Sequence, residues 1–357
     1  MNNKIKRCKK CILPNTYPGI DFNEKGICNY CNYFEASKEM RNSLKEDLKG
    51  QFYQLIEETK TKKKEYDCIV CYSGGKDSTF LLMELKEKFN LKILAFTLDN
   101  NFLSDRAKLN IKVIVNKLCI DYIIIKPEQD IICKIFRDVL TQKIVYPTEL
   151  TAMLSPLCVA CQGMILAAAF RLAKEKDISI VFVGFTPGQY PDVSYENFLK
   201  TKSCIYFSNT VYKDDPPDII KMIRDPIDEV LGEKAGKYYL KSQYLEKGES
   251  YPYALFPFHA ILNYNEEYIY KKIKTIGWIK PDDTDSCSTN CLINSLANLV
   301  FLKQYGYHPY IAEISAMVRD GLFNKEYALG LEKIEENNNI LKRSLDKLQL
   351  SREDVGI

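Results

Sequence analysis

The segment Ser73-Gly74-Gly75-Lys76-Asp77-Ser78 places two glycines, a lysine and two hydroxyl side chains in six consecutive positions. Two glycines let backbone amides approach an anion closely. A helix that begins at about Asp77 would direct its positive N-terminal end at the same place. Lys76 adds a cation, and Ser73 and Ser78 can donate hydroxyl hydrogen bonds. The residue types and their order therefore predict a cradle for phosphate groups.

A second set of residues with chemistry lies near the N-terminus, where two C-x-x-C pairs are separated by 16 residues rich in Pro, Gly and Asn. Four thiolates at this spacing match a closed, tetrahedral structural zinc site. The chain has 13 cysteines, and in a reducing compartment metal binding or catalysis is a better expectation than a disulfide framework. The expected zinc ligands are Cys8, Cys11, Cys28 and Cys31.

Strand-like and helix-like segments alternate after Tyr66 and would position the phosphate cradle. DCIVCYS, LKILAFTLDN, DYIIIKP and ISIVFVGF are apolar runs separated by helix-like stretches. Continuous rather than alternating apolar runs are typical of strands covered on both faces. The pattern predicts an α/β fold with a doubly wound parallel sheet. SGGKDS follows the first strand, at the edge where such sheets bind ligands.

The pattern along the chain suggests four parts. Residues 1–34 form the zinc ribbon, which is too short to bury a core alone. The high charge of residues 35–65 indicates a helical connector. Residues 66–220 form the nucleotide-binding domain, and residues 221–357 form a mainly helical region that contributes cysteines to the active site.

Charge and hydropathy exclude some classes of partner. Lys and Arg total 50 against 47 Asp and Glu, a net charge of +3, which disfavours an extended nucleic-acid-binding surface. No apolar run approaches the roughly 18–20 residues that span a bilayer. The basic N-terminus is not followed by the apolar stretch of a secretory signal. We therefore expect a cytoplasmic protein without a membrane partner.

The order Ser-Gly-Gly-Lys-Asp-Ser between a strand and a helix resembles the PP-loop of the ATP pyrophosphatases, or adenine nucleotide alpha hydrolases, over about residues 66–190. It is not a Walker A loop, because G-x-x-x-x-G-K-[ST] is absent. The resemblance implies that a substrate carbonyl oxygen attacks the α-phosphorus of ATP and expels pyrophosphate. Lys76 and a Mg²⁺ ion, with Asp77 as a contact, would meet the developing charge. The implied ATP-binding residues are Ser73, Gly74, Gly75, Lys76, Asp77, Ser78, Thr97, Leu98, Asp99 and Gly184.

A further C-x-x-C, Cys158 and Cys161, precedes a helix-like stretch, and a later segment contains Cys287 and Cys291. One pair plus a distant cysteine resembles the scheme by which PP-loop tRNA sulfurtransferases bind a three-cysteine 4Fe–4S cluster. The open iron of such a cluster could hold a sulfide as nucleophile. We expect Cys291 to be the third ligand, with Cys287 in reserve. A second zinc site formed by all four cysteines, and a persulfide-relay cysteine without metal, stay open as alternatives.

Two resemblances bear on the group that is transferred. The N-terminal segment with LPNTYPG is similar to sugar amidotransferases that make acetamidino groups with ammonia from a glutaminase partner. The segments GFTPGQYPD and DSCSTNCLINSLAN depart from that group. The second of them resembles PP-loop proteins suspected to build thioamides.

We therefore expect sulfur insertion into a small-molecule or carrier-bound amide, with a sulfide or sulfur donor and a possible homodimer. Ammonia transfer is the alternative hypothesis, and tRNA thiolation is the third. A nucleotide-binding scaffold with a degenerate site also stays open, although the intact Lys76 and Asp77 argue against it.

Overall fold

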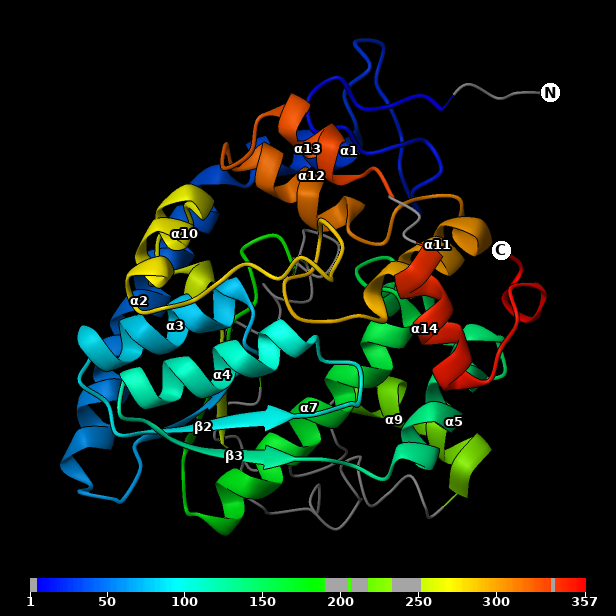
Figure 1. Ribbon diagram of the computed structural model, residues 1–357. Coiled ribbons are helices and arrows are strands. Elements are labelled where there is room, and N and C mark those ends of the chain that lie inside the picture. Colours follow the sequence, from blue (N-terminus) through cyan, green and yellow to red (C-terminus); the bar gives the residue numbers. More distant parts are fainter. Residues whose placement is uncertain (1–4, 190–204, 207–217, 233–251, 335–337) are drawn as a thin grey trace.

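A computed structural model (Figure 1) describes residues 5–189, 205–206, 218–232, 252–334 and 338–357. Six strands form one sheet in the order β3-β2-β1-β4-β6-β5. The neighbouring pairs are parallel except for β5, which is antiparallel to β6. The predicted parallel α/β sheet is therefore confirmed. The strands are β1 (Cys68–Cys71), β2 (Ile93–Leu98), β3 (Asp121–Ile125), β4 (Ile180–Val183), β5 (Ile205–Tyr206) and β6 (Tyr253–Leu255).

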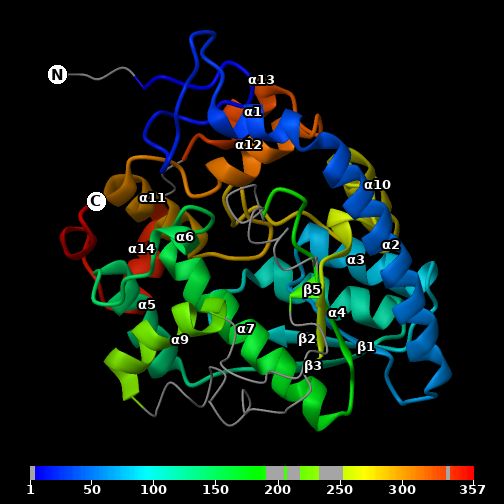
Figure 2. The ribbon, with the colours of Figure 1, turned by 180° about the vertical axis from the view of Figure 1, so that it is seen from behind.

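Helices cover both faces of the sheet, as Figures 1 and 2 show. Side chains of β1 alternate between the two cores: Cys68 and Val70 enter one, Ile69 and Cys71 the other. The first core is covered by α2 (Lys38–Thr61), α3 (Lys76–Glu87), α4 (Asp105–Lys117) and α10 (Glu266–Thr275). The second is covered by α5 (Gln129–Leu140), α7 (Pro156–Glu175), α9 (Asp218–Leu231), α11 (Asn294–Tyr305) and α14 (Asn338–Leu348). The sheet is thus doubly wound.

Every residue of β1, β2 and β4 is buried, which explains why their sequences are unbroken apolar runs. Strand β3 lies at the edge of the sheet and is largely open, with Tyr122 and Ile124 exposed. The central three strands therefore form the rigid part of the fold, and their carboxyl ends are the ones that carry the candidate site.

Helix α7 corrects one expectation. It is long and apolar enough to cross a membrane by length and composition, whereas the sequence suggested no such run. Of its most apolar 18-residue stretch, 61% is buried, and its side chains pack in the core against β1, β2 and β4. A buried core helix of an α/β domain can be equally long and apolar, so packing against the sheet explains the apolar character of α7.

The cysteine-rich N-terminal segment packs against the C-terminal helices at one end of the molecule (Figure 2). Its helix α1 (Asn29–Ala36) leads into α2, which runs from this end to the start of β1. The partner helices are α12 (Ile311–Arg319) and α13 (Lys325–Leu331). The remaining short helices are α6 (Thr148–Thr151), η3 (Pro257–His259) and η4 (Glu353–Val355).

The division of the chain into four parts stays a prediction. Strand β6 lies beyond residue 220, at which we place the end of the nucleotide-binding domain, and pairs with β4 in the same sheet. The segment after residue 220 thus supplies a strand as well as helices.

Candidate active site

The phosphate cradle forms a tight turn between β1 and α3. Gly74 has a φ of +76°, and a Cβ atom there would lie 2.5 Å from the carbonyl oxygen of Ala107. Only glycine fits both the backbone conformation and this close approach. The Oγ atoms of Ser73 and Ser78 lie 3.1 Å apart, and the backbone N–H of Gly75 donates to Ser73 Oγ at 3.3 Å. The hydroxyls therefore line the inside of the turn, as the sequence predicts.

A cavity of about 300 Å³ opens at the carboxyl ends of β1, β2 and β4. Because β1 has β2 on one side and β4 on the other, this is the point where the winding of the sheet changes direction. Its volume lies in the range of ligand sites in proteins. The predicted residues in its wall are Ser73, Gly75, Lys76, Asp77, Ser78, Thr97, Leu98, Gly184, Cys158, Cys161, Cys287 and Cys291.

Gly184 shapes this cavity by letting two backbones meet. A Cβ atom at this position would lie 3.1 Å from the Cα atom of Ser78, so the chain after β4 packs flush against the first turn of α3. Thr97 donates its hydroxyl to the carbonyl oxygen of Tyr72 at 2.5 Å and thereby ties the end of β2 to β1. Both predicted residues thus lie where the strands end.

Two predicted ATP-binding residues are absent from the described cavity wall, Gly74 and Asp99. The carbonyl oxygen of Gly74 accepts a hydrogen bond of 2.9 Å from Trp278 Nε1, which fixes the turn from outside. Asp99 accepts from the backbone N–H of Asn101 at 2.9 Å and shapes the turn after β2. Their assignment as ATP contacts stays a prediction.

Lys76 lies in a ring of polar groups. Its Nζ donates to both carboxylate oxygens of Asp77, at 2.8 and 2.9 Å, and to the hydroxyl of Tyr264 at 2.8 Å. Glu266 Oε1 lies 3.4 Å away. Burial alone would lower the pKa of Lys76, but the carboxylate of Asp77, with Tyr264 and Glu266, outweighs it and raises the pKa well above its usual value. The cradle therefore has a permanent cation.

A loop from the C-terminal region lies over the cradle. The backbone N–H of Lys76 donates to Thr289 Oγ1 at 3.0 Å, and Gly75 has no room for a Cβ because Thr289 Oγ1 would lie 2.9 Å from it. Cys291 forms a β-bridge with Leu103, in the segment between β2 and α4. The hydroxyl oxygen of Thr289 thus accepts a hydrogen bond from a backbone N–H group that would otherwise be available to a phosphate oxygen.

The sequence pointed to the cysteines of this loop but not to Thr289. It also gave no sign of Tyr264 or Glu266. A local signal exists only for the helix start: Asn265 Oδ1 caps α10 by accepting from the backbone N–H of Tyr268. Nothing in this local signal predicts that Tyr264 or Glu266 contacts Lys76.

Cys158 and Cys161 lie on the first two turns of α7, about one turn apart and on the same face. Asn100 Nδ2 donates to Cys161 Sγ at 3.2 Å. Burial raises the pKa of Cys161 to about 12. The pKa of Cys291 is raised by burial and, next, by the nearness of Cys161 and Cys158. The three thiols are therefore close enough for the charge of one to affect the pKa of another.

Cys287 lies in the cavity wall but is oriented differently. Its Sγ donates to the carbonyl oxygen of Leu331 at 3.4 Å, and its pKa is raised by burial and by Asp285 and Glu313. The choice of Cys291 as the third ligand, with Cys287 in reserve, stays a prediction.

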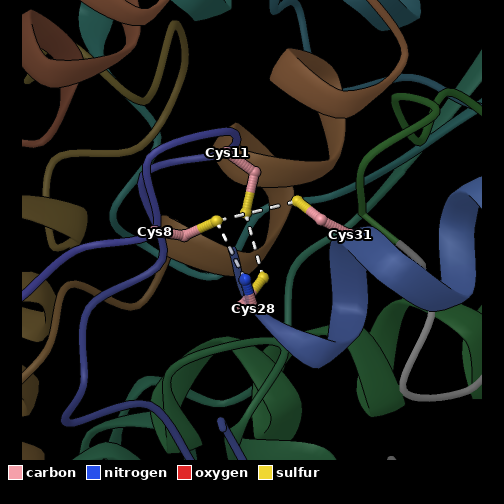
Figure 3. Close-up of side chains that lie close together, drawn as sticks. All are labelled: Cys8, Cys11, Cys28 and Cys31. Carbon is pink, nitrogen blue, oxygen red and sulfur yellow. Dashed lines mark hydrogen bonds between the residues drawn. The ribbon is translucent and has the colours of Figure 1, made fainter. Parts of the chain in front are cut away.

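The N-terminal cysteines converge on one point (Figure 3). The Sγ atoms of Cys8 and Cys31 lie 3.8 Å apart and those of Cys11 and Cys28 lie 3.6 Å apart. Tetrahedral zinc with Zn–S bonds of about 2.3 Å requires sulfur atoms about 3.8 Å apart. The four side chains are buried and would fit a zinc ion. Hydrogen bonds between the thiols lower the pKa of Cys11 to about 7, with Cys28 as the main donor.

The second cysteine group differs in spacing from the first. Within the part of the chain that the structure describes, the N-terminal four are the one group of three or more Cys, His, Asp or Glu ligands whose ligand atoms all lie within 4.8 Å. Cys158, Cys161 and Cys291 are therefore not arranged around a single ion. An iron–sulfur cluster binds each thiolate at a different iron and holds its ligands farther apart. Such a wider spacing is compatible with a cluster, and the choice between a cluster, a second zinc site and no metal stays a prediction.

Zinc removal should loosen the end of the molecule at which the ribbon packs. Cys8 and Cys11 share a buried cluster with Ile311 and Ile314 of α12. Structural zinc contributes about 10–16 kcal/mol to folding of zinc-finger peptides. We expect Cys28→Ser, or chelation, to increase amide hydrogen exchange in residues 5–36 and in α12 while α3 stays protected. Unchanged exchange in α12 would show that the ribbon does not support it.

Comparison with known proteins gives distant similarities. No protein-family model matches the chain. An uncharacterized protein of Methanocaldococcus jannaschii is 24% identical over 323 residues, which cover 90% of this chain and 91% of that protein. Among solved structures, the U34-tRNA thiolase NcsA from Methanococcus maripaludis with its [4Fe-4S] cluster aligns over 98% of this chain and 91% of its own, with 14% identity and a TM-score of 0.37.

The NMN synthetase from Francisella tularensis aligns over 87% of this chain and 97% of its own, with 13% identity and a TM-score of 0.35. The NH3-dependent NAD synthetase from Campylobacter jejuni aligns over 86% and 96%, with 12% identity and a TM-score of 0.29. Independently of these similarities, the parallel sheet and the place of SGGKDS after its β1 strand are those that the PP-loop resemblance implies.

Proposed function

We propose that this chain is a PP-loop enzyme that uses ATP, forms AMP and pyrophosphate, and replaces the carbonyl oxygen of an amide with sulfur. One observation carries the proposal: the phosphate cradle and the three grouped cysteines line the same cavity. A group that activates an oxygen and a group that could supply its replacement therefore face one bound substrate. A scaffold without chemistry would not need both in one pocket.

The residues of the cradle account for the first half of the reaction. An amide oxygen is a poor leaving group, and its bond to AMP makes it a good one. Gly75 and Lys76 would offer backbone amides to the phosphates, and the Lys76 ammonium would stabilise the charge on departing pyrophosphate. Asp77 binds Lys76 with both oxygens. It becomes available to Mg²⁺ when Lys76 turns to the phosphates.

Cys158, Cys161 and Cys291 would hold a 4Fe–4S cluster, and a cluster with three protein ligands would supply sulfide as the nucleophile. Neighbouring polar side chains would orient its ligands. Asn100 donates a hydrogen bond to Cys161 Sγ, and Tyr310 donates to Asn294 Oδ1 at 3.0 Å beside Cys158. The zinc of the ribbon is structural in this proposal. The enzyme is cytoplasmic, takes sulfur from a sulfide donor and forms a homodimer.

Anaerobic purification followed by metal, sulfide and AMP analysis tests the proposal. With ATP, sulfide and N-methylacetamide as a minimal amide, we expect AMP, pyrophosphate and the corresponding thioamide from a brown protein with iron and labile sulfide. A colourless protein with zinc alone that uses ammonia and forms an amidine would establish nitrogen transfer instead. Absence of AMP with every amide and with tRNA would contradict an adenylating enzyme.

A further inference from the structure

A buried carboxyl group that the proposed chemistry has not yet used lines the same cavity. Glu313 lies on the first turn of α12. Thr186 Oγ1 donates to its Oε1 at 2.6 Å. Its Oε2 is shielded from solvent, and no donor in the described part of the chain reaches it. A buried carboxylate oxygen without a donor is costly, so this oxygen is a place where a proton can bind.

Glu313 is held in place from two sides. A Cβ atom at Gly188 would lie 2.5 Å from the Glu313 carbonyl oxygen and 3.0 Å from its Cγ, so the loop after β4 packs directly on it. The other side of α12 packs on the ribbon, where Ile311 and Ile314 share a buried cluster with Cys11. The backbone of Glu313 is therefore tightly packed on both sides.

The surroundings of Glu313 adjust its affinity for a proton. Burial raises its pKa to about 7, although Thr186 and Lys76 act in the opposite direction. Asp77 and Glu266 are the facing groups that raise it further. Tyr310 and Cys287 also face it, and both stay uncharged near neutral pH because burial raises their pKa values. Near pH 7 the carboxyl group can therefore both accept and release a proton.

We propose that Glu313 accepts the N–H proton of the substrate amide during adenylation, so that the acceptor is an amide that carries an N–H. The inference rests on the proposed function. As the carbonyl oxygen bonds to the α-phosphorus, the bond to pyrophosphate breaks, the nitrogen electron pair forms a C=N bond, and the proton passes to Glu313. The products are an O-adenylyl imidate, pyrophosphate and protonated Glu313.

The second half of the reaction then needs no base if sulfur is transferred. Hydrosulfide adds to the imidate carbon, its proton ends on the nitrogen, and AMP leaves, which gives the thioamide. If ammonia were the nucleophile, AMP would leave in the same way, and the amidinium product would keep the proton that ammonia brings. The assigned step, removal of the amide proton, is the same in both versions.

Infrared difference titration of the wild-type enzyme and Glu313→Gln tests the proton site without a substrate. We expect a protonated-carboxyl band that disappears as pH rises through about 7 and that Glu313→Gln lacks. Thr186→Val should move the midpoint upward, because it removes a hydrogen bond that lowers the pKa of Glu313. An ionised Glu313 from about pH 5 to about pH 9 would overturn the proposal.

AMP formation from ATP and N-methylacetamide tests the role in the reaction. Glu313→Gln should lower kcat by about 10²-fold or more with little change in KM, and should remove the rise of activity through about pH 7. N,N-dimethylacetamide, which has no N–H, should not be converted even by the wild-type enzyme. The control is Glu267→Gln, which changes an exposed carboxylate on α10.

Two failures have different meanings here. Wild-type kcat and an unchanged pH profile in Glu313→Gln would overturn the assignment of Glu313 alone. A wild-type enzyme that forms no AMP with any amide would overturn the proposed function, and the role of Glu313 with it, whatever the infrared band shows.

Discussion

Lys76→Ala should reduce AMP and pyrophosphate formation by about 10²–10³-fold, the usual effect of removing a group that stabilises transition-state charge. The Lys76 ammonium is the cation inside the cradle, and its raised pKa keeps it charged near neutral pH. The measurement is AMP formation at saturating ATP, with zinc, iron and sulfide determined on the same sample. Metal content should be unchanged, because none of the cysteines contacts Lys76 through a described hydrogen bond.

A matched control distinguishes loss of the cation in the cradle from loss of a lysine elsewhere in the protein. Lys112 lies exposed on α4, and Lys112→Ala removes the same side chain from the protein surface. Lys76→Ala also leaves Asp77 and Glu266 without their cation, and loss of one partner from a buried pair costs about 3–5 kcal/mol. Thermal unfolding should therefore accompany the assay. A folded Lys76→Ala that still forms AMP at the wild-type rate would contradict the cradle's role.

The second large effect concerns the three grouped cysteines. Cys158→Ala, Cys161→Ala and Cys291→Ala should each lose most iron and labile sulfide in anaerobic preparations, and thioamide formation with them. Each thiolate would bind a separate iron, so loss of one leaves that iron without its protein ligand. Adenylation should fall less than sulfur transfer, because the cradle does not contain these residues. Iron, sulfide and zinc analysis beside the AMP assay measures this difference.

Two further cysteines sharpen the assignment. Cys287→Ala should keep the iron, since Cys287 Sγ donates to Leu331 rather than joining the other thiols. Cys119→Ala changes an exposed cysteine and is the matched surface control. If Cys287→Ala lost the iron while Cys291→Ala kept it, the choice of third ligand would be wrong. Iron retained in all of these variants would remove the cluster from the proposal.

The long-range contacts of the site show why part of it could not be predicted. Tyr264 reaches Lys76 across 188 positions of sequence and Thr289 reaches it across 213. Glu313 meets Thr186 across 127. None of these residues has a motif around it, because an isolated tyrosine, threonine or glutamate has the same local pattern in any helix or loop. Their roles depend on how α10, α12 and the loop over the cradle pack on the sheet.

The sequence by itself determined the features whose geometry comes from neighbouring backbone. Two glycines, a lysine and the serines after a buried strand can form only a tight turn into a helix, so the cradle was readable from six residues. The two C-x-x-C motifs likewise predicted a four-sulfur site, although its short contacts, Cys8 to Cys31 and Cys11 to Cys28, join one motif to the other. Only the tertiary structure placed the Thr289 hydroxyl on the cradle amide and the Glu313 carboxyl in the same cavity. Packing between distant segments makes those contacts, and burial then adjusts the charge of each group.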